Sequence, residues 1–197
     1  MHRRIAIVQG NPSPTPTHFG HALADAYAAG ATEANHEVRR TDVATLSFPF
    51  LTSKKEYETG PLPPGLVAAQ ATIGWADHLV FIFPLWLGTM PAILKGFLEQ
   101  VFRPGFALTA ASESETGWPK KLLQQKSARL VVTMGMPAFW YRWYYLAHGV
   151  RGMERNILRF CGIDPIRETF IGMVETKRAG AHDKWLKKMH RLGRTGS

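Results

Sequence analysis

Hydroxyl side chains gather in a short loop that leads from an apolar run into a helical pattern. The apolar run covers residues 4–9, and the loop behind it carries Ser13, Thr15 and Thr17. Free backbone amides at the start of a helix attract phosphate groups, and hydroxyls add further donors. The loop therefore indicates a phosphate site. Its three prolines supply no amide donor, so a plain proline-rich turn is the alternative. Neither the dinucleotide fingerprint G-x-G-x-x-G nor the loop G-x-x-x-x-G-K-[ST] is present.

Other kinds of site find no support in the residue pattern. The chain has one cysteine, Cys161, which excludes an internal disulfide, a zinc ribbon and an iron–sulfur framework. We expect Cys161 to be a small buried side chain rather than a nucleophile. The histidines show no spacing of metal ligands, and His21 is expected on the surface of a helix. No G-x-S-x-G motif supports an esterase.

Length and composition indicate an ordinary globular protein. The 197 residues carry 24 Lys and Arg against 15 Asp and Glu, and 45% of them are hydrophobic, so we expect one domain over residues 1–197. The apolar stretch near the start is too short for a signal peptide, and no run approaches the roughly 20 apolar residues of a membrane span. Together with the lone cysteine, these features predict a cytoplasmic protein without a membrane segment.

The basic excess is concentrated at the end of the chain. Residues 177–197 hold seven basic residues against Asp183, which accounts for +6 of the net charge of +9. Trp185, Met189 and Leu192 follow helical spacing, which predicts a last helix with a buried stripe and a solvated basic face. Aromatic residues do not alternate with basic ones as a nucleic-acid surface requires, so no nucleic-acid partner is expected. Attraction of an anionic cofactor, and a membrane or partner surface, stay open as alternatives.

Strand and helix patterns alternate along the chain. Short runs rich in apolar residues predict strands over 4–9, 37–42, 78–83, 128–133 and 166–172. Helical spacing predicts helices over 17–35, 65–75, 90–102 and 142–160, with Thr17 as the first N-cap. Residues 47–64 are too long for an ordinary connector, so we expect them to be functional or to wrap an edge.

This alternation predicts an α/β fold, a doubly wound five-stranded parallel sheet with helices on both faces. In such sheets, ligands bind outside the carboxyl ends of the strands, where the strand order reverses. The loops at residues 10–19, 83–90 and 133–141 lie at those ends. We therefore expect the site where these three loops meet.

The sequence of the second loop and of the helix after it resembles that of a known protein family. The run Pro91-Ala92-Ile93-Leu94-Lys95-Gly96, set after Phe83-Pro84-Leu85, resembles the flavodoxin-like NAD(P)H:quinone reductase family, which includes the mammalian quinone reductases, bacterial modulator-of-drug-activity proteins and the ancillary subunits of potassium efflux systems. The likeness covers nearly the whole chain. Further matches are Phe19, Asn35-His36-Glu37-Val38 with Asp42, Ala69-Gln70, Ala76-Asp77, Pro104-Gly105-Phe106-Ala107 and Phe160-Cys161-Gly162.

The resemblance implies a flavin, FMN or FAD, held by the three loops. Its phosphates would lie on the first loop, its isoalloxazine edge along the second and its pyrimidine end at the third, with Gln70 on the nucleotide part. Amides aimed at that end would stabilise the negative charge of reduced flavin. The implied cofactor residues are Asn11, Ser13, Thr17, His18, Phe19, Gln70, Pro84, Leu85, Trp86, Leu87, Thr133, Met134, Gly135 and Met136.

This chain departs from the family at several of these positions. Leu87 and Gly88 stand where relatives often carry aromatic residues, which implies a thinner wall on the substrate side. In the third loop Pro137 removes one possible amide donor. His18 replaces a common serine, and either a phosphate contact or an exposed position at the helix start suits it.

The resemblance also implies two residues for hydride transfer, Tyr141 and His148. A phenol can donate a hydrogen bond to a ring on which charge develops, and a histidine can give a proton to a quinone oxygen at neutral pH. His148 lies one residue further along than the family spacing. The alternative is that both side chains pack in a dimer interface, where we also expect the other aromatic residues of segment 139–145.

The expected function is that of a homodimeric flavoenzyme without a metal. NADPH or NADH would reduce the flavin, and a quinone or similar small molecule would take two electrons in the same pocket. The rival is a flavin-binding regulatory or redox-sensing module of a transport system. The identity of the flavin, the donor and the natural acceptor, and any role of the basic tail, stay open at this point.

Overall fold

The computed structural model describes residues 2–110, 118–176 and 180–197. Its centre is one sheet of five parallel strands in the order β2-β1-β3-β4-β5. The strands are β1 (Arg4–Gln9), β2 (Glu37–Asp42), β3 (His78–Pro84), β4 (Ser127–Thr133) and β5 (Ile166–Ile171). This sheet confirms the predicted α/β fold and the five predicted strands.

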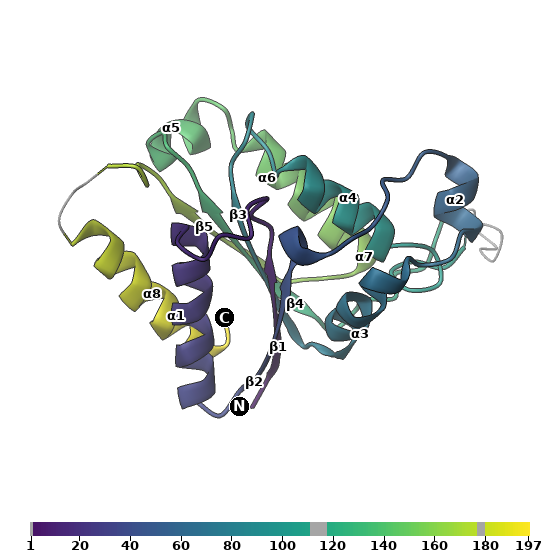
Figure 1. The fold of residues 1–197 in the computed structure, drawn as a ribbon, viewed down its shortest axis with the longest axis horizontal. Coiled ribbons are helices and arrows are strands. Elements are labelled where there is room, and N and C mark those ends of the chain that lie inside the picture. Colours follow the sequence, from purple (N-terminus) through teal and green to yellow (C-terminus); the bar gives the residue numbers. More distant parts are fainter. Residues whose placement is uncertain (1, 111–117, 177–179) are drawn as a thin grey trace.

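Helices cover both faces of the sheet (Figure 1). On one side lie α1 (Phe19–Glu33) and α8 (Ala181–Thr195), and on the other lie α3 (Val67–Trp75), α4 (Ala92–Val101) and the segments that follow β4. Those segments are α5 (Ala138–Trp143), α6 (His148–Gly152), the π-helical turn η4 (Met153–Leu158) and α7 (Arg159–Cys161). The connection from β2 contains η1 (Val43–Thr45), α2 (Lys54–Thr59) and η2 (Pro64–Leu66).

Side chains of the central strands alternate between two cores. Ile7 and Ile82 face the core under α1 and α8, whereas Val8 and Phe81 face the opposite core. Both sets are buried, which is why the central strands are continuous apolar runs. Since these residues leave no polar face on the central strands, chemistry is confined to the ends of the sheet.

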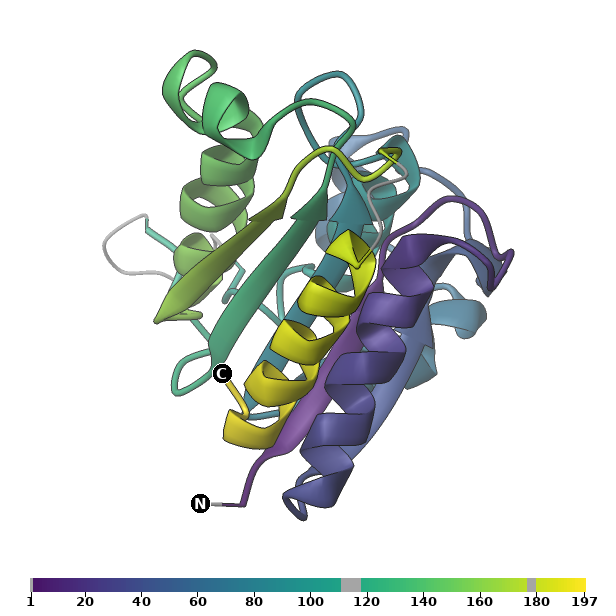
Figure 2. The ribbon, with the colours of Figure 1, turned by 90° about the vertical axis from the view of Figure 1, so that its left-hand side faces the viewer.

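Helices α1 and α8 lie side by side against the sheet (Figure 2). A Cβ at Gly30 would come within 2.0 Å of the carbonyl oxygen of His190, and one at Gly193 within 2.0 Å of that of Tyr27. These glycines let the two backbones touch. Met189 is buried and Trp185 and Leu192 pack beside it, so the apolar stripe predicted for the last helix is confirmed.

Two local predictions were wrong, and a third segment holds a helix that was not predicted. The first helix begins at Phe19 with His18 as its N-cap, not at Thr17, and His18 makes no capping hydrogen bond with its side chain. The predicted helix over 142–160 is broken, because Leu146 and Ala147 adopt left-handed φ angles of 51° and 50°. Residues 47–64 contain the unpredicted α2, whose N-cap Ser53 accepts a hydrogen bond from the amide of Glu56.

Among the described residues, no helix is both long enough and apolar enough to span a membrane.

Candidate functional site at the carboxyl edge of the sheet

Three loops meet where the strand order reverses between β1 and β3. The register pairs Gln9 with Ile82 and Pro84 with Thr133, so the strands end at a common edge. The amide of Gly10 donates to the carbonyl oxygen of Ile82 at 2.8 Å, and the amide of Leu85 donates to that of Thr133 at 2.7 Å. These bonds join the start of each loop to its neighbour, which places the three expected loops together.

The first loop, residues 10–18, is held largely by its own side chains. The Asn11 Oδ1 atom accepts from the amide of Ser13 at 3.0 Å, and the Ser13 hydroxyl donates to the Thr15 Oγ1 atom at 3.0 Å. Such side-chain bonds replace the backbone donors that the prolines lack. A Cβ at Gly10 would lie 2.6 Å from a methyl carbon of Leu94, so the loop leaves the sheet in close contact with α4.

The loop ends at a helix N-terminus that no side chain caps. Thr17 and His18 are exposed, and Phe19, the first residue of α1, stacks its ring on that of His182 with centroids 4.1 Å apart. The first amides of a helix have no partner within the helix. This end of α1 can therefore donate to an anion, aided by the helix dipole.

A buried amide group next to the first loop also suits a polar ligand. Gln9 is almost wholly buried, and its Oε1 atom accepts from the amide of Asn11 at 3.2 Å. Its Nε2 atom has no hydrogen-bond partner among the described residues. Buried amide donors normally have a partner. An orphaned donor beside an uncapped helix start fits the phosphate end of a nucleotide cofactor.

The second loop forms a tight turn that exposes its backbone. Trp86 and Thr89 exchange hydrogen bonds of 2.9 and 3.0 Å, and the two residues between them, Leu87 and Gly88, have φ angles of 46° and 81°. Trp86 is half-exposed and Leu87 fully exposed. The turn holds Pro84, Leu85, Trp86 and Leu87 at the edge, where a flat ring could lie along their backbone.

In the third loop, only part of the predicted set is open to a ligand. Thr133 and Met134 are buried, and the amide of Met134 donates to the carbonyl oxygen of Ile171 at 2.9 Å. Gly135 is exposed and Met136 half-buried. A Cβ at Gly135 would lie 3.7 Å from a carboxylate oxygen of Glu175, so an acidic side chain that sequence analysis missed faces this loop.

Tyr141 lies against the second loop from the other side. Its buried hydroxyl donates to the carbonyl oxygen of Gly88 at 2.9 Å and accepts from the amide of Val150 at 3.4 Å. Burial raises the pKa of the Tyr141 phenol above its ordinary value. The geometry makes Tyr141 a tie between the second loop and α6.

His148 and Gln70 occupy different surroundings. His148 is exposed at the first residue of α6, just beyond the break at 146–147. Gln70 donates from Nε2 to the carbonyl oxygen of Val101 at 2.9 Å, at the end of α4 opposite the second loop. Its amide is thus bound to a helix end, and the structure does not join it to the three loops by a hydrogen bond.

A hollow of about 570 Å³ lies away from these loops, between α2, α4 and α7. Cys161 lines it together with Tyr57, Phe102 and Phe160. Cys161 is buried, as expected, and this burial raises the pKa of its thiol to about 12. In the described ranges, no group of three or more His, Cys, Asp or Glu side chains could hold a metal ion.

An all-parallel sheet in this strand order, with its open loops gathered at the switch point between β1 and β3, defines a doubly wound α/β protein. Residues 3–192 match the family described as flavodoxin-like fold, and the chain belongs to this family.

The sequence is also similar to those of named proteins. Rat NAD(P)H dehydrogenase [quinone] 1 is 29% identical over 197 residues, covering 86% of this chain and 68% of its own length. A ribosyldihydronicotinamide dehydrogenase-like protein of Penicillium crustosum is 34% identical over 110 residues. The match covers 54% of this chain and 40% of that protein.

Solved structures agree over almost the full length. Smu.1420 from Streptococcus mutans UA159 superposes with a TM-score of 0.78 at 27% identity, covering 99% of this chain and 100% of that one. The NAD(P)H:quinone oxidoreductase of Methanothermobacter marburgensis gives a TM-score of 0.80 at 24% identity and covers 98% of each chain, a likeness of fold.

Proposed function

We propose that this protein is a flavin-dependent NAD(P)H:quinone oxidoreductase. The observation that carries the proposal is the meeting of three loops and an uncapped helix N-terminus at the switch point of a flavodoxin-like sheet. The rat relative, whose match covers 86% of this chain, is named NAD(P)H dehydrogenase [quinone] 1. NADPH or NADH would be the donor, and a quinone or a similar small molecule the acceptor.

The first loop would hold the phosphate of the flavin. Thr17, His18 and Phe19 would donate from the start of α1, with Asn11 and Ser13 beside them. The orphaned Nε2 atom of Gln9 supports an anionic group here. Gln70 stays a proposed contact of the nucleotide part, and binding there would require it to release Val101.

The second and third loops would hold the ring. The backbone of Pro84, Leu85, Trp86 and Leu87 would follow its edge, and residues 133–136 would face its pyrimidine end. Since the amide of Met134 is already engaged, we assign donation at that end to the open part of the loop around Gly135. When bound, the flavin supplies the acceptance and donation of hydride.

Tyr141 and His148 would serve the transfer in different ways. The phenol of Tyr141 fixes the carbonyl of Gly88 and with it the turn that receives the ring. His148, exposed at the same edge, can give a proton from its imidazole to an acceptor oxygen.

A homodimer would cover the aromatic surface next to this site. Phe139, Trp140, Trp143, Tyr144 and Tyr145 are all exposed, and Trp140 stacks on Tyr144 with centroids 5.2 Å apart. Exposed aromatic clusters of this kind mark interaction surfaces. Light scattering at micromolar concentration should give the mass of two chains. The mass of one chain with full activity would refute the dimer.

The lone, buried cysteine agrees with the reducing cytoplasm, which we propose as the location of this protein.

The proposal is tested by weighing the cofactor and following the donor. Purified protein should release FMN or FAD, identified by mass spectrometry, and should oxidise NADPH or NADH faster when a quinone is added. Absence of any bound or bindable flavin would contradict the proposal. A bound flavin that neither donor reduces within minutes would instead favour the redox-sensing module.

A further inference from the structure

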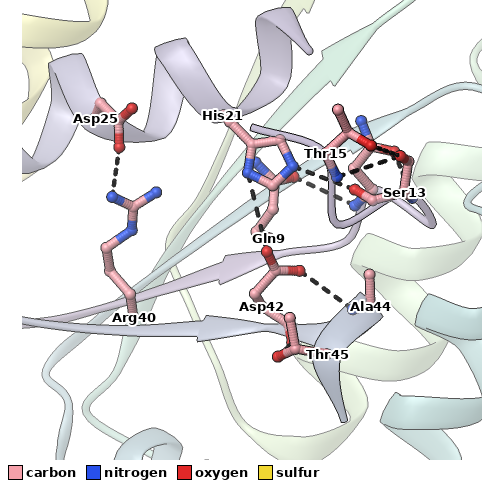
Figure 3. Close-up of polar contacts among 10 residues, drawn as sticks. Gln9, Ser13, Thr15, His21, Asp25, Arg40, Asp42, Ala44 and Thr45 are labelled. Carbon is pink, nitrogen blue, oxygen red and sulfur yellow. Dashed lines mark hydrogen bonds and ion pairs between the residues drawn. The ribbon is translucent and has the colours of Figure 1, made fainter. Parts of the chain in front are cut away.

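The side chain of His21 is buried beside the first loop, whereas the sequence predicts it on the surface of the helix (Figure 3). It stands in the first turn of α1, and only 6% of its surface is exposed. Buried histidines need partners for both ring nitrogens, because an unpaired polar atom in the interior costs free energy.

Both ring nitrogens of His21 face oxygen atoms that can only accept. The Nε2 atom lies 3.3 Å from the carbonyl oxygen of Ser13, and the Nδ1 atom lies 3.9 Å from the Oδ2 atom of Asp42. Because a carbonyl oxygen only accepts, the Nε2 atom donates to Ser13, and the longer contact at Nδ1 turns this edge of the ring toward the carboxylate of Asp42. The ring therefore links the end of β2 to the middle of the first loop (Figure 3).

Asp42 is itself fixed in place for this contact. Its Oδ1 atom accepts from the amide of Ala44 at 3.2 Å, and its carbonyl oxygen accepts from the Thr45 hydroxyl at 2.9 Å. Arg40, a cation of β2, is paired with Asp25 of α1. This leaves the second carboxylate oxygen of Asp42 directed at His21 (Figure 3).

The bonds within the first loop leave the carbonyl oxygen of Ser13 to a partner outside the loop. Pro12, Pro14 and Pro16 have no amide hydrogen, and the bonds within the loop come from Asn11, Ser13 and Thr15. In the part of the chain that the structure describes, the contact of His21 with the Ser13 carbonyl is the side-chain link from α1 to the middle of this loop.

We propose that His21, oriented by Asp42, is a positioning residue that holds the first loop in the shape that receives the flavin phosphate. This inference rests on the proposed function. The ring acts on the phosphate through the backbone of Ser13, whose carbonyl oxygen it holds in place. His21 should therefore matter for ligands that carry the phosphate and not for the same ring system without it.

The test compares the affinities of FMN and of riboflavin, which lacks the phosphate. Their ratio is measured by titration of the flavin-free protein in wild type, His21→Phe, His21→Gln and Asp42→Asn. His190→Gln is the matched control, because the imidazole of this half-buried histidine pairs with Glu33, away from the three loops. We expect wild type to prefer FMN, and His21→Phe to lose about tenfold or more of that preference.

The remaining variants test the hydrogen-bond donor and its orientation by Asp42 separately. His21→Gln keeps a donor for the Ser13 carbonyl and should retain most of the preference for FMN. Asp42→Asn should lose several-fold of that preference. The affinity for riboflavin should not change in any variant. Should His21→Phe fail to fold, Asp42→Asn carries the test. A full preference for FMN in both His21→Phe and Asp42→Asn would overturn the inference. No preference for FMN in wild type would instead refute the proposed phosphate site.

Discussion

The hydroxyl of Tyr141 donates a hydrogen bond of 2.9 Å to the carbonyl oxygen of Gly88, across 53 residues of sequence. This bond joins α5 to the turn between β3 and α4, and the same hydroxyl receives the amide of Val150 from α6. One phenol thus ties together two segments that border the proposed flavin site. The phenol oxygen thus adds a side-chain link to the backbone bonds that shape the turn.

Tyr141→Phe removes that oxygen and nearly conserves shape. The variant leaves the amide of Val150 and the carbonyl of Gly88 without this partner, which should cost roughly 1–2 kcal/mol of stability. Because the turn loses its tie, we expect flavin reduction or reoxidation to slow about ten- to hundredfold while flavin content stays unchanged. Stopped-flow traces equal to wild type in both half-reactions would contradict this role.

His148→Gln tests the second residue separately. Its side chain is exposed, so the fold should keep its stability. If the imidazole passes a proton to the acceptor, reoxidation by a quinone should slow about ten- to hundredfold, near the usual contribution of a proton-transfer group, and flavin content should not change. Equal reoxidation rates in the variant and wild type would remove His148 from the reaction.

Gly149 is the point of closest contact between α6 and the turn. A Cβ there would lie 2.1 Å from the carbonyl oxygen of Gly88 and 2.8 Å from the Cα atom of Thr89. Gly149→Ala should therefore destabilise the protein by about 1–3 kcal/mol and weaken flavin binding. Gly152→Ala is the matched control, because nothing lies within 4 Å of a Cβ at that helical position. The control should be neutral or slightly stabilising in thermal unfolding. Equal melting temperatures for the two variants would disprove the contact.

Thr17 offers a hydroxyl at the start of α1 but does not cap the helix. Thr17→Val should weaken flavin binding by roughly 1–2 kcal/mol, the value of a hydrogen bond to a charged group. The stability of the flavin-free protein should hardly change, because Thr17 is exposed and His18 is the N-cap. Titration with unchanged affinity would remove Thr17 from the site.

His78 predicts a loss of stability in acid. It is buried at the opposite edge of the sheet, with its Nδ1 atom 2.7 Å from the Ser127 hydroxyl. Burial and nearby positive charges lower its pKa from 6.5 to about 3. Between these values the unfolded chain binds more protons than the folded one, so stability falls as the pH drops below 6.5.

The variant His78→Gln should lose this dependence. Denaturant unfolding at pH 7.5 and pH 5 should show wild type losing roughly 1–2 kcal/mol more than the variant over this interval. The same loss in both proteins would assign the acid sensitivity to other groups.

Burial explains which parts of the fold the sequence could predict. Strands such as 78–83 are buried on both faces, so their apolar runs are unbroken and unmistakable. The break in the segment 142–160 could not be predicted, because Leu146 and Ala147 carry no sign of a left-handed backbone. That conformation is set by packing of α6 on the turn at Gly88, a contact between distant segments.

Contacts between distant segments also limited what could be predicted of the site. The three loops could be located from topology, but the tie from Tyr141 to Gly88 and the acidic neighbour of Gly135 depend on tertiary contacts. The burial of His21 could have been predicted from its position in the helix. It falls on the same face of α1 as Ala24 and Tyr27, three and six residues on, which are buried. A polar residue on a buried stripe is a reason to look for its partners.

In the proposed function, this chain passes electrons from a nicotinamide to a quinone through a flavin held by the three loops. Anaerobic stopped-flow absorbance can follow both half-reactions, with flavin-loaded protein mixed first with NADPH or NADH and then with a quinone. We expect rapid bleaching of the oxidised flavin by at least one donor and its full return on addition of the quinone. A flavin that stays oxidised with both donors, or that stays reduced in the presence of the quinone, would refute the proposed function.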